Sequence, residues 1–383
     1  TGDENWVEAS MGGGGFTAAG DLSGNGTSQT VIGLNAVPLP EALPTNSYLI
    51  SAHTLLMLSN SPYGITSDGY SVWIADEDNV NNDGNYGGLV RVFYDDTWIT
   101  TRYDYSSEIP VKLTTIAYHP NGYLYATGVS NMQRWTPQIY KIDPSNGTII
   151  DNQYLAASAY IYVAGETLWI TIPSSANYLY KVDPDNISSV QLALSSTKTP
   201  PYFCGFAYDS DSNKIWVSDN FNGTINKVYP ITLNVDITTT DYMYPCGLAY
   251  GNSKVWLTSG YNSYYGYGLS IIYALDPDNP GIGSAITVTD NYMLLSDNLL
   301  ISYDTTNNCL WCLCDGEISR LLRVNSSYVI DGLASLENMT NNSIISAGNY
   351  VWVVDNPSGI SQGVDLGPIG QKSILKIQPS EVL

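Results

Sequence analysis

One pattern of apolar and polar positions repeats from residue 62 onward: a short apolar strand, a turn, and a second strand centred on an aromatic residue. The central aromatics are Trp73, Tyr125, Trp169, Trp216, Trp256, Trp311 and Trp352. They stand 40 to 55 residues apart, close to the roughly 40–50 residues of a four-stranded propeller blade. Because apolar residues alternate with polar ones and do not follow a helical period, the pattern predicts an all-β fold, a seven-bladed β-propeller.

The strands on either side of the aromatic strand carry their own signals. Gly64, Gly205 and Gly247 lie near the start of the preceding strand, where small residues suit the crowded inner end of a blade. The following strand ends at pairs such as Asp143-Pro144, because proline cannot continue a β-ladder and aspartate can bond back to a turn. Each unit therefore reads as a meander of strands and short turns.

Two parts of the chain differ in character. Residues 51–383 contain the repeats, whereas residues 1–50 hold four consecutive glycines and little apolar material, which predicts an extended, fibre-like leader. The last repeat ends one strand short of four, and the apolar stretch 53–58 precedes the first repeat without a partner. We therefore expect residues 53–58 to form the outer strand of the last blade and to close the ring.

Charge and composition limit the partners of the chain. The net charge is -22 and only 13% of residues are charged, so phosphate backbones and anionic lipid surfaces are repelled. No run approaches the roughly 18–20 apolar residues of a membrane span. These features predict no nucleic-acid partner and no membrane insertion, and they favour neutral sugars or proteins. The five cysteines are expected to be packed thiols, with a Cys204–Cys246 bridge as the alternative.

The leader carries one phrase that is familiar from another class of protein. Residues 19–50 read "AGDLSGNGTSQTVIGLNAVPLPEALPTNSYLI". This stretch resembles a segment of bacteriophage tail fibres and related virion appendages, in which similar phrases precede the distal receptor-binding domain. The resemblance rests on "GDLSG" at 20–24 and "TVIGL" at 30–34, and it covers about a tenth of the chain. The propeller repeats themselves are similar to those of NHL- and YVTN-type propellers.

The tail-fibre resemblance implies a stalk, usually of three chains wound together, that carries an adhesive head. A physical reason supports assembly, because short isolated apolar stretches cannot bury themselves, whereas copies from neighbouring chains could cover one another. The predicted assembly residues are Leu22, Val31, Ile32 and Leu34. We therefore expect the partners to include copies of the chain itself, in a trimer or a helical fibre.

Few residues are suited to catalysis. The chain holds only two histidines, His53 in the predicted closing strand and His119 in a turn, so a histidine acid or base has little support. Propeller lactonases and lyases hold an axial divalent cation with side chains from different blades, which no linear spacing can reveal. The sequence predicts a protein that is not an enzyme, with a metal-dependent propeller hydrolase or lyase as the alternative.

Residues 75–88, "ADEDNVNNDGNYGG", interrupt the first repeat and match the first half of a calcium-binding loop. The candidate ligands are Asp76, Asp78, Asn79, Asn81 and Asp83. Val90 stands where the loop pattern requires a bidentate glutamate, so a solvated loop rich in turn formers is the alternative. No cofactor is required by the sequence, and Ca²⁺ is the one candidate.

A second insertion, "SGYNSYYGYGLS" at 259–270, offers aromatic side chains among small residues. Tyrosine gives contact area and a hydroxyl group at low entropic cost, and binding loops use the same mixture. The predicted ligand-binding residues are Tyr261, Tyr264, Tyr265 and Tyr267. Packing over a neighbouring blade or against another copy is the alternative for the same side chains.

Seven sequons would allow glycosylation, at Asn25, Asn146, Asn186, Asn222, Asn325, Asn338 and Asn341. Taken together, the sequence predicts a structural or adhesive component of an extracellular fibre or virion appendage. Its propeller loops would bind a cell-surface glycan or protein, and its location would be extracellular or on the virion surface. A secreted propeller enzyme with an axial metal and a passive surface scaffold are the two alternatives.

Overall fold

The computed structural model of the chain describes most of the propeller and five short stretches of the leader. The described residues are 22–25, 28–31, 33–34, 37–38, 48–49, 52–56, 62–76, 87–94, 100–105, 111–130, 136–172, 178–195, 203–220, 222–239, 245–259, 271–280, 283–287, 299–314, 319–336, 341–355, 373–377 and 379. Among them, no helix has the length and apolar character of a membrane span. Two units can be separated, Thr1–Ser47 and Tyr48–Leu383.

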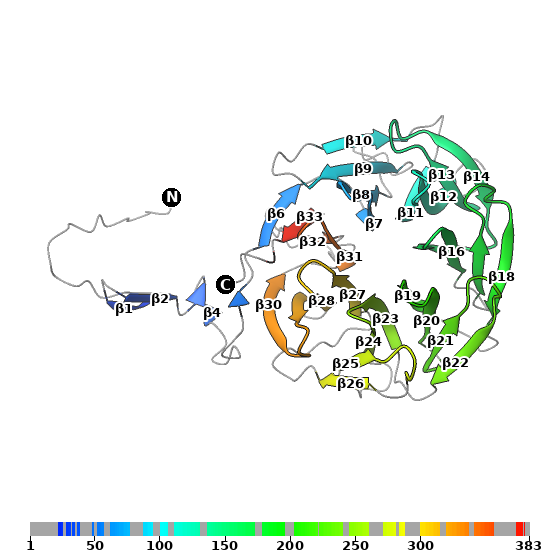
Figure 1. The fold of residues 1–383 in the computed structure, drawn as a ribbon. Coiled ribbons are helices and arrows are strands. Elements are labelled where there is room, and N and C mark those ends of the chain that lie inside the picture. Colours follow the sequence, from blue (N-terminus) through cyan, green and yellow to red (C-terminus); the bar gives the residue numbers. More distant parts are fainter. Residues whose placement is uncertain are drawn as a thin grey trace. The chain divides into compact units, whose positions relative to one another are not determined.

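Seven antiparallel sheets of the second unit stand around a common axis, as Figure 1 shows from one face. The first three blades are β7 (Pro62–Ser67), β8 (Ser71–Asp76), β9 (Gly88–Phe93) and β10 (Thr100–Asp104); β11 (Val111–Tyr118), β12 (Leu124–Ser130), β13 (Thr136–Ile142) and β14 (Ile149–Tyr154); and β15 (Tyr160–Ala164), β16 (Thr167–Ile172), β17 (Tyr178–Val182) and β18 (Val190–Ser195). In each blade the first strand lies innermost and the fourth outermost.

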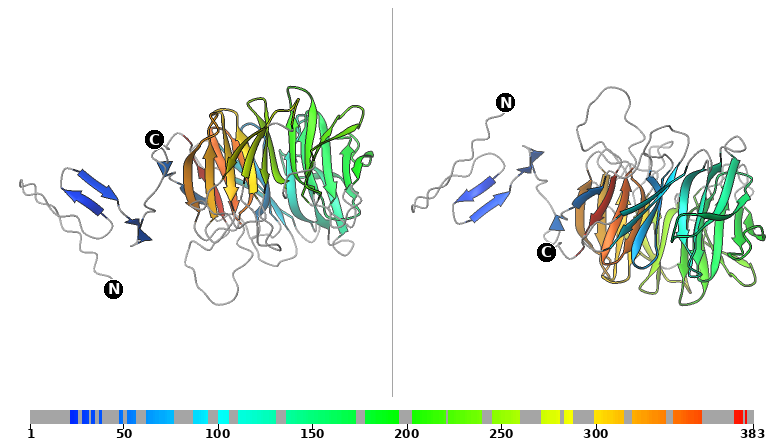
Figure 2. Two further views of the ribbon diagram at one scale, coloured as in Figure 1. Left: turned by 90° about the horizontal axis from the view of Figure 1, so that it is seen from below. Right: turned by 90° about the horizontal axis from the view of Figure 1, so that it is seen from above.

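The remaining four blades follow the same order. They are β19 (Phe203–Asp209), β20 (Lys214–Asp219), β21 (Thr224–Val228) and β22 (Val235–Thr239); β23 (Pro245–Gly251), β24 (Lys254–Ser259), β25 (Ile271–Leu275) and β26 (Gly283–Thr287); β27 (Leu299–Asp304), β28 (Cys309–Cys314), β29 (Ser319–Val324) and β30 (Ile330–Leu336); and β31 (Asn341–Ala347), β32 (Tyr350–Asp355), β33 (Ser373–Ile377) and β6 (Ala52–Leu56). The predicted all-β, seven-bladed propeller is thus confirmed, and the views in Figure 2 show the strands crossing the thickness of the disc.

The last blade is built from both ends of the unit. β6 pairs antiparallel with β33 and takes the outer position, in the stretch where the sequence predicts a closing strand at 53–58. β5 (Tyr48–Leu49) adds a short parallel strand to the edge of β30 in the sixth blade. The chain that enters the propeller therefore pairs with the outer strand of the sixth blade and then completes the seventh.

The first unit contains two small hairpins. β1 (Leu22–Asn25) pairs with β2 (Ser28–Val31), which sets Leu22 opposite Val31 in register. β3 (Gly33–Leu34) pairs with β4 (Val37–Pro38). Three of the four residues predicted to mediate assembly lie in these hairpins, and Ile32 falls outside the described residues. Their role between copies of the chain stays a prediction.

The seven central aromatics form the core of the propeller. Each is buried, with 0% to 1% of its surface exposed, and each packs with apolar residues of the following blade. Trp73 of the first blade, for example, lies in one cluster with Leu113 of the second. Trp352 of the last blade lies with Val72 of the first, so the clusters continue around the ring. A repeat of about 40–50 residues therefore encodes one blade and the apolar surfaces with which that blade packs against its two neighbours.

Inner strands of neighbouring blades approach so closely that glycine is required at some positions. A Cβ on Gly64 would lie 2.8 Å from the Cα of Thr115, and a Cβ on Gly205 would lie 2.0 Å from the carbonyl oxygen of Cys246. Side-chain hydroxyls bridge the same strands: the Thr115 Oγ1 accepts from the Ile161 amide at 3.2 Å. Such bonds satisfy inner edges that would otherwise be left unpaired.

Candidate functional site

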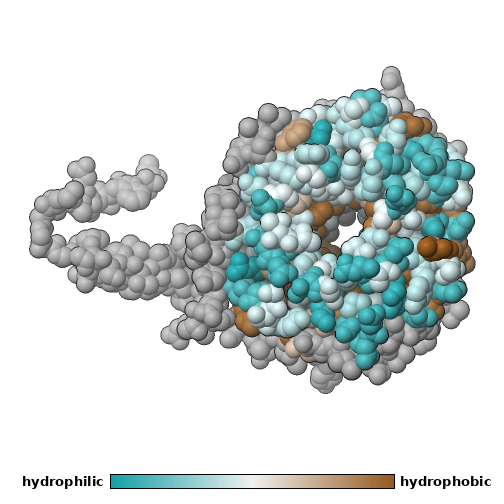
Figure 3. All heavy atoms as spheres, in the orientation of Figure 1, coloured by the Kyte–Doolittle hydropathy of each residue, from teal (hydrophilic) through white to brown (hydrophobic). Residues whose placement is uncertain are grey.

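The inner strands of all seven blades enclose a cavity of about 590 Å³ on the axis, which Figure 3 shows as an opening through the disc. Among the described residues that line it, none is aspartate, glutamate, histidine, lysine or arginine. Its polar groups are hydroxyls, such as those of Thr66, Thr115, Ser302 and Tyr160, and backbone amides. The described lining of this axial channel is therefore uncharged, with hydroxyl groups, aromatic rings and aliphatic side chains such as Ile65, Leu248 and Ile344.

A divalent cation does not fit the described lining of the channel. Ca²⁺ takes 6–8 oxygen ligands that normally include carboxylates, and Zn²⁺ requires thiolate, imidazole or carboxylate. The described lining offers none of these side chains. Elsewhere in the described ranges, no three His, Cys, Asp or Glu side chains gather where they could hold a metal ion. We derive no reaction step through an axial metal.

The meander topology divides the blade connections between two faces. In an antiparallel meander, the connections from first to second strand and from third to fourth strand leave the same side. We call this side the turn face; in the second blade it carries residues 119–123 and 143–148. We call the opposite side the loop face, where the second strand leads to the third. The β8–β9 and β24–β25 connections, which contain both sequence-predicted insertions, join strands at the loop face.

Eight of the nine predicted ligand-binding and metal-binding residues lie in these two insertions, outside the described residues. They are Asp78, Asn79, Asn81, Asp83, Tyr261, Tyr264, Tyr265 and Tyr267. Asp76 is the exception: it ends β8, has 0% exposure, and accepts a hydrogen bond from Arg102 Nη1 at 2.8 Å. The structure therefore gives Asp76 a cationic partner within its own blade, and calcium binding by the insertion stays a prediction.

The described sequons differ in the surroundings of their side chains. Asn146 and Asn186 are exposed in turns of the turn face. The side-chain amides of Asn222 and Asn325 instead donate to the carboxylates of Asp219 and Asp331. Asn25 and Asn341 lie in β1 and β31, and Asn338 falls outside the described residues. Among the four sequons whose asparagine side chain the structure describes, Asn146 and Asn186 are therefore the exposed ones.

The histidine and cysteine side chains in the described part of the propeller are structural. His119 lies in a turn as predicted, but it is only 3% exposed, with Nδ1 accepting from the Asn121 amide. Cys246, Cys309 and Cys312 are buried thiols outside any disulfide, so Cys246 does not form the alternative bridge. Burial raises the pKa of the Cys309 thiol to about 12, which keeps it protonated and unreactive.

The sequence interpretation missed a repeated cation on the third strand. Opposite the central aromatic, six of the seven described blades carry lysine or arginine in register: Arg91, Lys141, Lys181, Lys227, Arg323 and Lys376. The fifth blade has Ala274 at this position. Because cross-strand partners share one face of a sheet, these cations point the same way as the aromatics, toward the next blade.

All four lysines in this set form a hydrogen bond to the following blade. Nζ of Lys141 donates to the Pro184 carbonyl at 3.0 Å, and Nζ of Lys181 donates to the Pro230 carbonyl at 2.8 Å. The same bond joins Lys227 to Pro277 at 2.8 Å and Lys376 to Tyr94 at 2.9 Å. Lys141, Lys227 and Lys376 also lie beside aromatic rings; Lys227 Nζ is 5.2 Å from the Trp216 ring centre. We call this lysine–carbonyl bond the blade latch.

Removing one latch is expected to weaken the propeller. Lys227 is 8% exposed, and burial together with Lys214 lowers its pKa. Lys227→Met keeps most of the aliphatic stem but leaves the Pro277 carbonyl without its donor, so we expect a loss of about 1–3 kcal/mol in unfolding free energy. Urea denaturation measures it. Lys254→Met, which removes a half-exposed cation 4.0 Å from Asp276, is the control and should cost less than about 1 kcal/mol. Equal losses would contradict the latch.

Comparisons with known proteins give the fold. No protein-family model matches the chain, and no curated protein is similar to it in sequence. A chain of the mitotic checkpoint complex aligns over 91% of this chain and 98% of its own, with TM-score 0.57 and 11% identity. The Cps50 (Swd1) β-propeller domain of Myceliophteria thermophila aligns over 86% and 100%, with TM-score 0.59 and 10% identity. U3-55K aligns over 85% and 98%, with TM-score 0.56 and 8% identity. At such identities the likeness shows the β-propeller fold alone.

Proposed function

We propose that this chain is a binding protein, an adhesive or structural component of an extracellular fibre or virion appendage that holds a cell-surface glycan or protein. One observation carries the proposal: long second-to-third-strand connections, at 77–87, 260–270 and 356–372, all join strands at the loop face. Binding residues are commonly found on loops held by a rigid scaffold. The rigid scaffold here is a closed ring of seven blades.

The chemistry of the propeller supports a neutral or protein ligand. The described lining of the axial channel has no charged side chain, and the net charge of -22 disfavours polyanions. Tyrosines at 261, 264, 265 and 267 would add rings and hydroxyls to the loop face. This combination favours hydrogen bonding and ring stacking over ion pairing.

The appendage part of the proposal rests on the leader. Its resemblance to tail-fibre segments and its short apolar strands support assembly of several copies, as a trimer or a helical fibre. Several weak sites on one assembly would bind a cell surface far more tightly than a single copy. The similarity to NHL- and YVTN-type propellers belongs to the same proposal and concerns only the head.

The experiment compares the full chain with a chain that begins at residue 48. We expect negative-stain microscopy and sedimentation to show oligomers or fibres for the full chain and single discs for the shortened one. The full chain should also bind whole host cells, and Tyr264→Ser with Tyr265→Ser should weaken this binding without changing assembly. A full chain that is monomeric at all concentrations and binds no cell surface would refute the proposal.

The two alternatives make different predictions. A passive surface scaffold would assemble like the proposed appendage but would bind no ligand. A propeller enzyme with an axial metal would be a monomer with an activity that chelators abolish. The described lining of the channel does not fit that metal, so we do not propose a reaction.

A further inference from the structure

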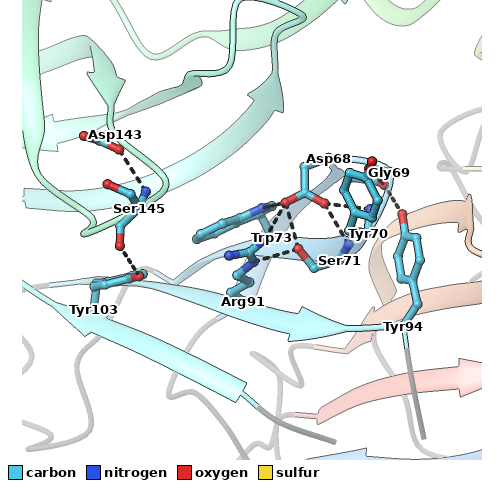
Figure 4. A network of polar contacts seen from close by, with 11 residues as sticks. Asp68, Gly69, Tyr70, Ser71, Trp73, Arg91, Tyr94, Tyr103, Asp143 and Ser145 are labelled. Atoms are coloured by element: carbon cyan, nitrogen blue, oxygen red, sulfur yellow. Dashed lines mark hydrogen bonds and ion pairs between the residues drawn. The ribbon is translucent and has the colours of Figure 1, made fainter. Parts of the chain in front are cut away.

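Among the described blades, two have an arginine at the latch position, and each arginine bonds within its own blade. In the sixth blade Arg323 Nε donates to Asp331 Oδ1 at 2.7 Å; the other case is the boundary after the first blade, on the turn face. Arg91 of the first blade stands at the position of the latch lysines, opposite Trp73. Its guanidinium folds back within its own blade: Nη2 lies 3.1 Å from Asp68 Oδ2, and Nε donates to Ser71 Oγ at 2.8 Å (Figure 4). In the part of the chain that the structure describes, the Pro144 carbonyl of the second blade receives no latch bond.

A cavity lies at this boundary. It measures about 280 Å³ and is lined by Asp68, Tyr70, Arg91, Tyr118, Pro144 and Ser145. The first blade contributes the Asp68–Arg91 pair and Tyr70, and the turn after β13 contributes Pro144 and Ser145. We call this cavity the boundary pocket. It is smaller than the roughly 300–1,000 Å³ of pockets for drug-sized ligands, so it suits one ring-sized group.

The arginine wall of the pocket is held rigidly. The guanidinium carbon lies 4.9 Å from the Trp73 ring centre and 4.4 Å from the Phe93 ring centre. Asp68 also accepts from Trp73 Nε1 at 2.9 Å and from the amides of Tyr70 and Ser71. Burial acts to raise the pKa of Asp68, but these hydrogen bonds outweigh it and lower the pKa, which keeps the carboxylate ionised beside Arg91.

We propose that the boundary pocket binds one neutral sugar residue of a glycan. The Arg91 guanidinium has further N–H donors after its bonds to Asp68 and Ser71. Pro144, which lines the same pocket, occupies in the second blade the place of Pro184 in the third, whose carbonyl accepts a latch bond. A sugar hydroxyl both accepts and donates, so neighbouring hydroxyls can satisfy both walls. Tyr70, 78% exposed at the rim, offers a ring face for the apolar side of a sugar.

Charge argues for a neutral sugar over an acidic one. Asp68 already neutralises Arg91, and the whole chain carries a net charge of -22. A carboxylate on the ligand would meet Asp68 across the same small pocket. This inference rests on the proposed function, because it names the glycan as ligand, but it places a binding site on the turn face, opposite the insertions.

The test uses two variants of the full chain on an array of neutral oligosaccharides, acidic oligosaccharides and peptides. Arg91→Lys removes the bond from Nε to Ser71 and is designed to form the missing latch to Pro144, as Lys141 does to Pro184, and so to close the pocket. Urea denaturation checks that the variant is folded under the conditions of the array. We expect Arg91→Lys to abolish binding to neutral glycans. Tyr70→Ala should weaken binding about tenfold, the effect of losing one aromatic contact. Tyr154→Ala, which removes a 46% exposed ring on β14, should change nothing.

The outcomes separate this inference from the proposed function. Glycan binding that survives Arg91→Lys and Tyr70→Ala but fails with Tyr264→Ser and Tyr265→Ser would overturn the boundary pocket and leave the proposed function standing. Binding only to acidic glycans or to peptides, or to nothing on the array, would also overturn it. Fibres and cell binding by the same preparation would then still support an adhesive appendage.

Discussion

A chain shortened to begin at residue 61 is expected to lose the closed ring. It lacks β6, the outer strand that pairs with β33 through Leu56 opposite Ile374 and Thr54 opposite Leu375. Ile374 and Leu375 are 1% and 3% exposed and also pack against the neighbouring blades, so loss of the paired strand should uncover part of each and cost roughly 1–3 kcal/mol. The unpaired edge of β33 would also promote aggregation. Thermal and urea denaturation measure the loss of stability.

The matched control begins at residue 48. This chain keeps β5 and β6 and lacks only the first unit, so its propeller should unfold at the same temperature and urea concentration as the full chain. If the two shortened chains prove equally stable, β6 does not close the ring. If both shortened chains are less stable than the full chain by the same amount, the first unit, and not β6, supports the propeller.

Gly205→Ala is expected to be the most damaging single substitution in the inner ring. Its Cβ would lie 2.0 Å from the Cys246 carbonyl oxygen and 2.7 Å from Ser218 Oγ. Neither neighbour can retreat easily, because Ser218 Oγ accepts from the Gly205 amide at 2.8 Å and donates to that same carbonyl at 2.7 Å. Separating the fourth and fifth blades to admit one methyl group should cost about 3 kcal/mol, measured by urea denaturation.

Gly69→Ala distinguishes crowding from a general cost of losing glycine. Gly69 lies in an exposed turn with φ +89 and nothing within 4 Å of an added Cβ. Its substitution should cost about 1 kcal/mol through backbone strain alone. A loss for Gly205→Ala no larger than for Gly69→Ala would mean that the inner strands can move apart.

The sequence predicted the fold well because the repeat is local. Each blade is encoded within about 40–50 residues and contains one aromatic strand with a turn on either side. Trp73 and its six counterparts could therefore be recognised as equivalent positions in the sequence. The inner glycines were also readable: Gly64 and Gly205 stand where backbones of adjacent blades converge. Closure of the ring could be inferred because one blade was a strand short.

The blade latch and the boundary pocket could not be predicted in the same way. The acceptor of Lys141 is the backbone carbonyl of Pro184, in another blade. Because every residue has a backbone carbonyl, residue type does not identify this acceptor. The recurring lysine in "YKID", "YKVD" and "LKIQ" was a usable signal, since a cation follows the aromatic strand in six of the seven blades. Arg91 bonds to the Asp68 carboxylate of its own blade and not to the Pro144 carbonyl of the next blade. The choice between these two acceptors depends on their positions in the folded chain, which residue spacing does not reveal.

The entry of the chain into the propeller has a mechanical consequence. A pulling force applied at residue 47 acts first on the hydrogen bonds of the parallel pair β5–β30. It then acts on those of the antiparallel pair β6–β33. These bonds belong to the sixth and seventh blades, so a pull on one end of the polypeptide is shared by two neighbouring sheets before it reaches any core. In the proposed appendage, a pull through the leader would thus act first on the two blades that close the ring.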